Sequence, residues 1–124
     1  RMTQPFLVEP LAHGFLGPLI ALTLPRQPRR RLTLQEATIL SRALDAVAKG
    51  ASPERQIYMS PVASDCDFEA RLVSSSLVVV CEGCADAALS FEEALRLAQA
   101  LRQSAETPSQ KAPTGQGSED EWPM

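Results

Sequence analysis

Two segments that share helical periodicity and the same start signal constrain the fold more than any other feature. Leu32–Gly50 and Leu89–Glu106 each begin with a hydroxyl residue followed three positions later by a glutamate, Thr33 with Glu36 and Ser90 with Glu93. In such a capping box the hydroxyl accepts from a backbone N–H of the first turn, and the glutamate accepts from the cap N–H. Apolar residues then recur every three or four positions. The sequence therefore predicts two amphipathic helices.

The two predicted helices align without gaps at an offset of 57 residues, with six of the thirteen positions of Leu32–Leu44 identical. The same offset lays Phe15–Leu24 over Leu72–Cys81. Each of these segments is interpreted as two strands around a tight turn, at Gly17-Pro18 and at Ser74–Ser76. We therefore predict a hairpin–helix (ββα) unit that occurs twice. The alternative is convergence, because capping and periodicity alone force some of the identities.

Alternation in the segment DCDFEARL supports the second hairpin. Its acids fall on one strand face and its apolar residues on the other, with Asp65, Asp67 and Glu69 opposed to Cys66, Phe68, Ala70 and Leu72. A further strand is predicted at Gln56–Met59. The predicted fold class is α+β: one antiparallel sheet with two helices on one face, in a single domain over 1–105 with halves of about 5–50 and 55–105. The other sheet face is left open, which favours a homodimer.

Charge and composition exclude several classes of protein. Residues 1–105 hold 11 basic and 11 acidic residues, so the net charge of −3 lies in the tail. A neutral body argues against a general nucleic-acid binder. Three cysteines are too few for a disulfide framework, and the longest apolar run is much shorter than the ~20 residues of a membrane span. Arginine exceeds lysine by 10 to 2. We expect a cytoplasmic bacterial protein.

The three cysteines are the first place to look for chemistry. Cys81 and Cys84 form a CxxC, and a hairpin turning about Ser75 would place Cys66 opposite Cys84. With His13 as a fourth ligand, a zinc site is conceivable, and so is redox chemistry. The favoured interpretation is that the cysteines are small apolar fillers of the sheet. We therefore predict no metal and no cofactor.

The sequence contains no recognisable set of catalytic residues. His13 is the single histidine, and no nucleophile or orienting group lies at a suitable spacing from it. Asp65, Asp67 and Glu69 could hold a cation, but alternating acids usually mark the solvated face of a strand. Phosphate loops, dinucleotide fingerprints and metalloprotease motifs are absent. We predict that the protein is not an enzyme.

A basic cluster precedes the first helix, in the segment PRQPRRR. Its members are Arg26, Arg29, Arg30 and Arg31. Arginines near a helix N-terminus could contact phosphate or nucleic acid. A solvated loop that balances the acidic tail is the favoured alternative.

The C-terminal segment 106–124 is predicted to be a disordered acidic tail, since Pro, Gly, Ser, Thr and Gln dominate it. It ends in three acids, the single tryptophan, and Pro-Met: Glu119, Asp120, Glu121, Trp122 and Met124 form the predicted partner-binding site. About eight residues resemble the C-terminal tip of bacterial single-stranded DNA-binding proteins, without that family's terminal Phe. The resemblance implies recruitment of another protein.

These features together predict a non-enzymatic adaptor or regulatory protein-binding module. The open sheet face, or the groove beside the helices, would hold one partner, and the tail would recruit another. One alternative is a single-strand nucleic-acid-binding protein that uses the arginine cluster. Another is an acidic chaperone-like protein that binds a client.

Overall fold

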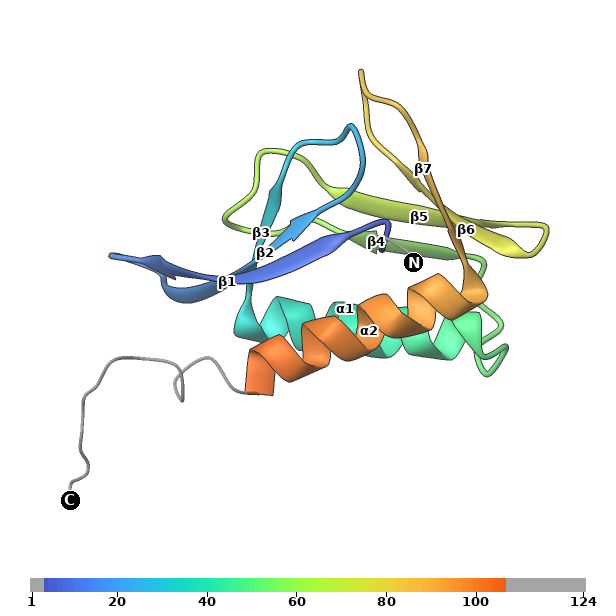
Figure 1. Cartoon of the computed structure of the whole chain (residues 1–124). Helices are drawn as coiled ribbons and strands as arrows, with labels where there is room; N and C mark the ends of the chain where they lie inside the picture. The colour runs from blue at the N-terminus through green and yellow to red at the C-terminus, as the bar shows by residue number, and fades with distance from the viewer. Residues whose placement is uncertain (1–3, 107–124) are drawn as a thin grey trace.

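The computed structural model describes residues 4–106. Its elements follow the order β1 (Leu7–His13), β2 (Gly17–Thr23), β3 (Arg30–Thr33), α1 (Leu34–Ala48), β4 (Gln56–Met59), β5 (Phe68–Val73), β6 (Ser76–Val80), β7 (Ala87–Ser90) and α2 (Phe91–Glu106). In Figure 1, α1 and α2 lie side by side, and the strands lie above them. The α+β class is therefore confirmed.

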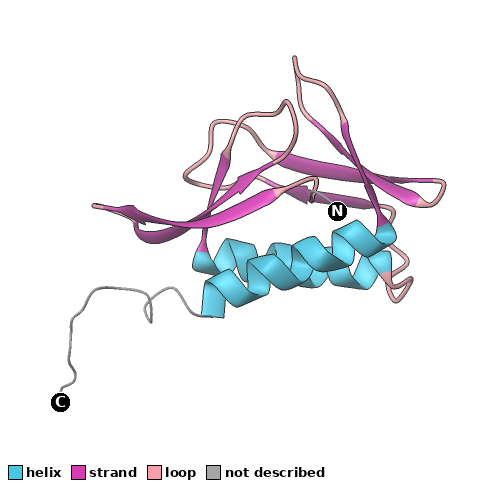
Figure 2. Ribbon diagram, in the orientation of Figure 1, coloured by secondary structure: helices cyan, strands magenta, loops and turns pink. Residues whose placement is uncertain are grey.

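The strands form two antiparallel sheets instead of the single sheet that was predicted. One sheet has the order β1-β2-β3 and the other has the order β4-β5-β6-β7. Both lie on the same side of the helix pair (Figure 2). Pairing stops at β3 because the hydroxyl of Ser64 bonds both the N–H and the carbonyl of Arg31. The connection between β4 and β5 therefore occupies part of the edge on which a further strand would have paired.

Both predicted helix starts are confirmed. At α1, the N–H of Glu36 donates to the Thr33 hydroxyl over 3.1 Å, and the N–H of Thr33 donates to the Glu36 carboxylate over 2.9 Å. At α2, Ser90 and Glu93 make the same two bonds at 3.1 and 2.9 Å. Each box satisfies two N–H groups that a helix start would otherwise leave unpaired.

The first hairpin differs from its prediction. Its turn lies at residues 14–16, and Gly17-Pro18 begins β2 instead of forming the turn. β1 was missed because Pro10 sits inside it, and proline cannot donate to a strand ladder. Proline is tolerated here because β1 is the edge of its sheet. The second hairpin is confirmed, with Val73 opposite Ser76.

The core lies between the helices and the two sheets. Its members include Leu40 and Leu44 of α1, Leu97 and Leu101 of α2, and Phe68 of β5, all with no exposed surface. The Ser41 hydroxyl donates to the carbonyl of Ala98 over 2.8 Å and so links the helices inside the core. β2 is buried on both faces, from Leu19 to Leu22.

Some strand pairs recur 57 residues later, and one helix–helix bond joins residues related by the 57-residue offset. Leu19 of β2 pairs with Thr33 of β3, and Ser76 of β6 pairs with Ser90 of β7, each 57 residues later. The bond between Ser41 and Ala98 also joins positions that are 57 residues apart. The β1–β2 and β5–β6 pairs do not follow this offset. Leu19 pairs with Leu11, so the offset would place Phe68 opposite Ser76, but Ser76 pairs with Val73.

The turns that lead into β3 and β7 also match. Gln27 N–H donates to the carbonyl of Leu24, and Cys84 N–H donates to the carbonyl of Cys81, both over 3.1 Å. The third residue of each turn has a positive φ, 60° at Arg26 and 77° at Gly83. The CxxC is therefore a β-turn, and the turn over residues 24–27, which has the same bond and a positive φ at the same position, contains no cysteine.

Candidate functional site

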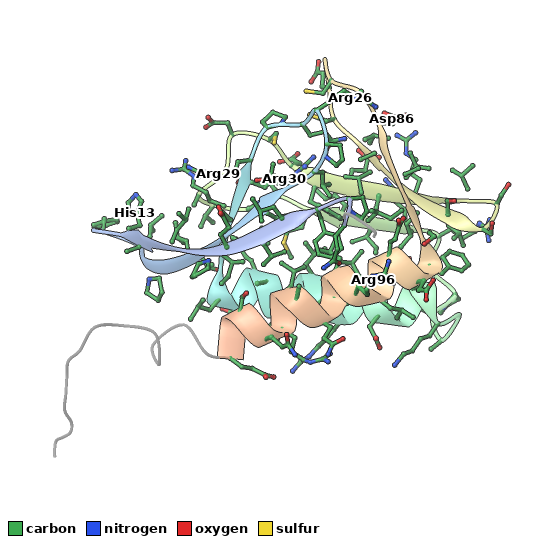
Figure 3. All side chains as sticks on the ribbon, viewed as in Figure 1. His13, Arg26, Arg29, Arg30, Asp86 and Arg96 are labelled. Carbon is green, nitrogen blue, oxygen red and sulfur yellow. The ribbon has the colours of Figure 1, made fainter. Side chains whose placement is uncertain are left out.

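A buried arginine joins the two halves of the domain. Arg30 of β3 has no exposed surface, and its Nε donates to the carbonyl of Asp67 over 2.9 Å. Its Nη1 donates to Oε1 of Gln27 over 2.9 Å. The guanidinium carbon lies 5.5 Å from the centre of the Phe68 ring, which suits a cation–π contact. Figure 3 shows Arg30 inside the fold, in contrast to Arg29.

Gln27 completes this bridge. Its Nε2 donates to the carbonyls of Val79, over 3.0 Å, and Ala85, over 2.8 Å. One side chain of the β2–β3 connection therefore bonds a carbonyl of β6, a carbonyl of the β6–β7 connection and one guanidinium. Within residues 4–106 no ion pair involves Arg30, and its Nη2 is buried without a hydrogen-bond partner. A buried guanidinium with no ion pair and an unpaired N–H is costly, although its charge also lowers the pKa of Asp67, so the surroundings of Arg30 are a candidate for function.

A hollow of about 400 Å³ lies beside Arg30. It is lined by the end of the β4–β5 connection, the start of β5, the end of β6 and the turn that follows β6: Asp65, Cys66, Asp67, Glu69, Val80, Cys81 and Glu82. Four of these residues are acids and two are thiols. Asp65, Asp67 and Glu69 all line this hollow, but so does Cys66, which the predicted alternation placed on the opposite face, because residues 65–67 precede β5.

The acids at this hollow have partners of their own. Asp67 accepts hydrogen bonds from the hydroxyls of Tyr58 and Ser60, and these bonds lower the pKa of its carboxyl. The same bond to Asp67 raises the pKa of the Tyr58 phenol. Glu69 pairs with Arg71 over 2.9 Å. No group of three or more His, Cys, Asp or Glu in the described part of the chain is arranged to hold a metal ion.

The three cysteines do meet, but not in the predicted pairing. Cys66 and Cys81 lie close enough for each to influence the pKa of the other, and the observed register, with Glu69 opposite Val80, is one residue from the one that would place Cys66 opposite Cys84. Burial is the main cause that raises the pKa of Cys66. A hydrogen bond to Cys84 raises the pKa of Cys81, and the charge of Arg30 opposes both shifts.

His13 lies apart from the cysteines, at the end of the β1–β2 hairpin (Figure 3). Its Nδ1 accepts from the N–H groups of Phe15 and Leu16 over 3.1 and 3.0 Å. The imidazole therefore holds the turn in one conformation, and the structure does not bring it to the thiols as a fourth ligand.

The turn that His13 organises displays apolar side chains. Phe15 is 91 % exposed, the most of any large apolar residue between positions 4 and 106, and Leu16 beside it is 39 % exposed. Sequence reasoning missed this tip because it placed the turn at Gly17-Pro18 and assigned Phe15 to a strand. The signal that could have found it is Gly14, a turn residue that directly precedes Phe15.

The arginine cluster is divided by the fold. Arg26 and Arg29 are exposed, Arg31 is half-buried, and Arg30 is internal. Only the first two present free side chains on the surface of the β2–β3 connection. The predicted partner-binding residues Glu119, Asp120, Glu121, Trp122 and Met124 lie outside the described residues.

No helix between residues 4 and 106 is long and apolar enough to cross a membrane. Comparisons of the chain with protein-family models, with curated proteins and with solved structures gave no match, so its site is interpreted from its own geometry.

Proposed function

We propose that this chain is a non-enzymatic adaptor or regulatory module that binds a protein partner through the tip of its first hairpin. The observation that carries the proposal is Phe15, 91 % exposed on a turn that His13 holds in place. A large apolar side chain on a turn whose backbone is already held in place loses less entropy on binding than one on a free loop. Such a residue is a suitable anchor.

The tail supplies a second binding element in this proposal. Trp122 would enter another partner's pocket, and the acids before it would steer the tail towards a basic rim. Two binding elements at separate places on one chain are what an adaptor requires. A homodimer remains part of the proposal, with the tip meeting a second copy as its simplest form.

The geometry also favours binding over catalysis. Among residues 4–106, the histidine holds a turn at one end of the molecule, while the thiols lie beside Arg30. A nucleophile and a base within hydrogen-bond reach of one another are the usual requirement for covalent catalysis. The only histidine is engaged elsewhere.

We further infer that the two halves are copies of one strand–strand–helix unit, joined so that the helices pack through equivalent positions. The shared offset of 57 in the β2–β3 and β6–β7 pairs supports this inference, as do the matched turns. The hairpin tips then provide a natural comparison. The first carries Phe15 and Leu16, and the second carries Val73 before three serines.

The test compares the two tips in the full chain. The double variant Phe15→Ala/Leu16→Ala, the control Val73→Ala and a chain ending at Glu106 are used as bait against lysate, and bound proteins are quantified by mass spectrometry. We expect one partner to be lost with the first variant and kept with the control, whose side chain is 52 % exposed. If the double variant retained every partner that the unsubstituted chain binds, the tip would be ruled out.

The same preparations separate the alternatives. Light scattering shows whether the double variant changes the oligomeric state. Salt-dependent binding to a single-stranded oligonucleotide, lost with Arg26→Ala/Arg29→Ala, would replace the adaptor proposal with the nucleic-acid one. Loss of a partner only in the shortened chain would assign recruitment to the tail alone.

A further inference from the structure

The CxxC turn holds two cysteines at a separation that a disulfide can span. The turn is closed by Cys84 N–H, which donates to the carbonyl of Cys81 over 3.1 Å. The first and last Cα atoms of such a turn lie within about 7 Å of one another. Disulfides join Cα atoms up to about 6.8 Å apart. Bridging the two residues therefore needs little movement of the backbone.

The two sulfur atoms lie on the same side of the turn. The Sγ atoms of Cys81 and Cys84 are 3.8 and 3.7 Å from the same carbonyl oxygen, that of Glu82. Interaction with Cys84 is the main cause that raises the pKa of Cys81, so Cys81 keeps its proton, and its thiol donates towards the carbonyl oxygen of Glu82.

The surroundings combine access with a positive charge. All three cysteines are partly exposed, and Cys81 lines the hollow of about 400 Å³. Behind it lies Arg30, whose charge acts on Cys66 and Cys81 to favour their thiolates. Its Nη2 is buried and has no acceptor within residues 4–106. The pKa values of Cys66 and Cys81 are nevertheless raised, because burial and hydrogen bonding outweigh this charge, so exchange at this turn rests on access and on the spacing of the two sulfurs.

We propose that Cys81 and Cys84 form a reversible dithiol–disulfide site that reacts with small disulfides reaching this turn from solvent, where both thiols are partly exposed. Cys66 is a neighbouring thiol that stays outside the ring. The site is independent of the hairpin tip, and neither proposal needs the other.

The exchange balances in two steps. The Cys84 thiolate attacks one sulfur of the small disulfide, breaks its S–S bond and releases one thiolate. Cys81 then loses its proton and attacks the Cys84 sulfur, which forms the Cys81–Cys84 bond and releases the second thiolate. Two electrons and two protons pass from the protein to the small disulfide, which leaves as two thiols.

The experiment titrates the full chain with mixtures of reduced and oxidised glutathione. Remaining thiols are alkylated and located by mass spectrometry, and circular dichroism confirms that each sample is folded. We expect Cys81 and Cys84 to become protected together, Cys66 to stay alkylated, and the mass to fall by that of two hydrogen atoms. The Cys66→Ser variant should behave in the same way, whereas Cys81→Ser and Cys84→Ser should lose the intramolecular disulfide completely.

Three results would overturn the proposal. In the first, all three cysteines remain alkylated under excess oxidised glutathione while the chain stays folded. In the second, the disulfide joins Cys66 to Cys81. In the third, glutathione remains attached to Cys84 without ring closure in the unsubstituted chain. Partner binding by the hairpin tip is measured separately, so failure of one proposal is distinguishable from failure of the other.

Discussion

Replacing Gln27 with alanine tests whether the buried polar bridge holds the two halves together. This side chain makes three hydrogen bonds at once: Nε2 to the carbonyls of Val79 and Ala85, and Oε1 from Nη1 of Arg30. The substitution removes all three. It also leaves the buried cation with a second unpaired N–H, because Nη2 already lacks a partner within the described residues.

The magnitude follows from the character of these bonds. A hydrogen bond to a charged group contributes about 2 kcal/mol and a neutral one about 1 kcal/mol. The three bonds therefore give about 4 kcal/mol, a large share of the ~5–15 kcal/mol by which domains are usually stable. Gln27 is 8 % exposed, so solvent does little to replace what is lost.

The assay is urea unfolding followed by circular dichroism, with Gln56→Ala as the matched control. Gln56 is exposed, and its Nε2 donates to Glu69 over 2.8 Å. Deleting the same side chain there should cost below about 0.5 kcal/mol, because water replaces the bond. If Gln27→Ala lowered the free energy of unfolding by no more than Gln56→Ala does, the reasoning about the bridge would be refuted.

Three further predictions concern the caps, the pH dependence and the hairpin tip. Thr33→Ala and Ser90→Ala should each lower the free energy of unfolding by about 1 kcal/mol in urea titrations, and no change would contradict the observed capping boxes. The pKa of Asp67 is lowered by its bonds from Tyr58 and Ser60, so the stability it contributes is present above about pH 4 and is lost as pH falls through the lowered value. The pKa of Tyr58 is raised by the same bond to Asp67, so its contribution is present below about pH 10 and is lost as pH rises through the raised value. Urea unfolding across pH should show that Tyr58→Phe removes the alkaline loss and weakens the acid one, and an unchanged profile would argue against this bond. His13→Ala should speed hydrogen exchange at the amides of Phe15 and Leu16 without lowering the free energy of global unfolding, because only the turn loses its hydrogen-bond acceptor. Unchanged exchange at these two amides would mean that the imidazole does not hold the turn.

Local signals were sufficient to predict both helices from the sequence. A capping box is completed within four residues, so Thr33 with Glu36 and Ser90 with Glu93 make their bonds whatever the rest of the chain does. Local patterns also predicted the strand at Gln56–Met59 and the buried positions of Phe68 and Ala70. Successive side chains of a strand point to opposite faces, so alternation alone identifies the buried face.

The sequence predicted only part of the candidate site. Nothing in PRQPRRR distinguishes Arg30 from its neighbours, yet Arg30 alone is buried. Its environment comes from Asp67, Phe68 and Gln27, two of which lie more than 35 residues away along the chain. The gathering of three cysteines was anticipated, but their pairing was wrong by one register position.

The sequence by itself determined the elements that short-range bonds and periodicity specify: two capped helices, the β4 strand, and the hairpin from Phe68 to Val80. Only the tertiary structure decided that the strands divide into two sheets, that β1 tolerates Pro10 at an edge, and that Arg30 points inward while Phe15 points out. The physical reason is that edge positions, burial and the partners of a charged group depend on contacts between distant segments, and no local pattern encodes these contacts.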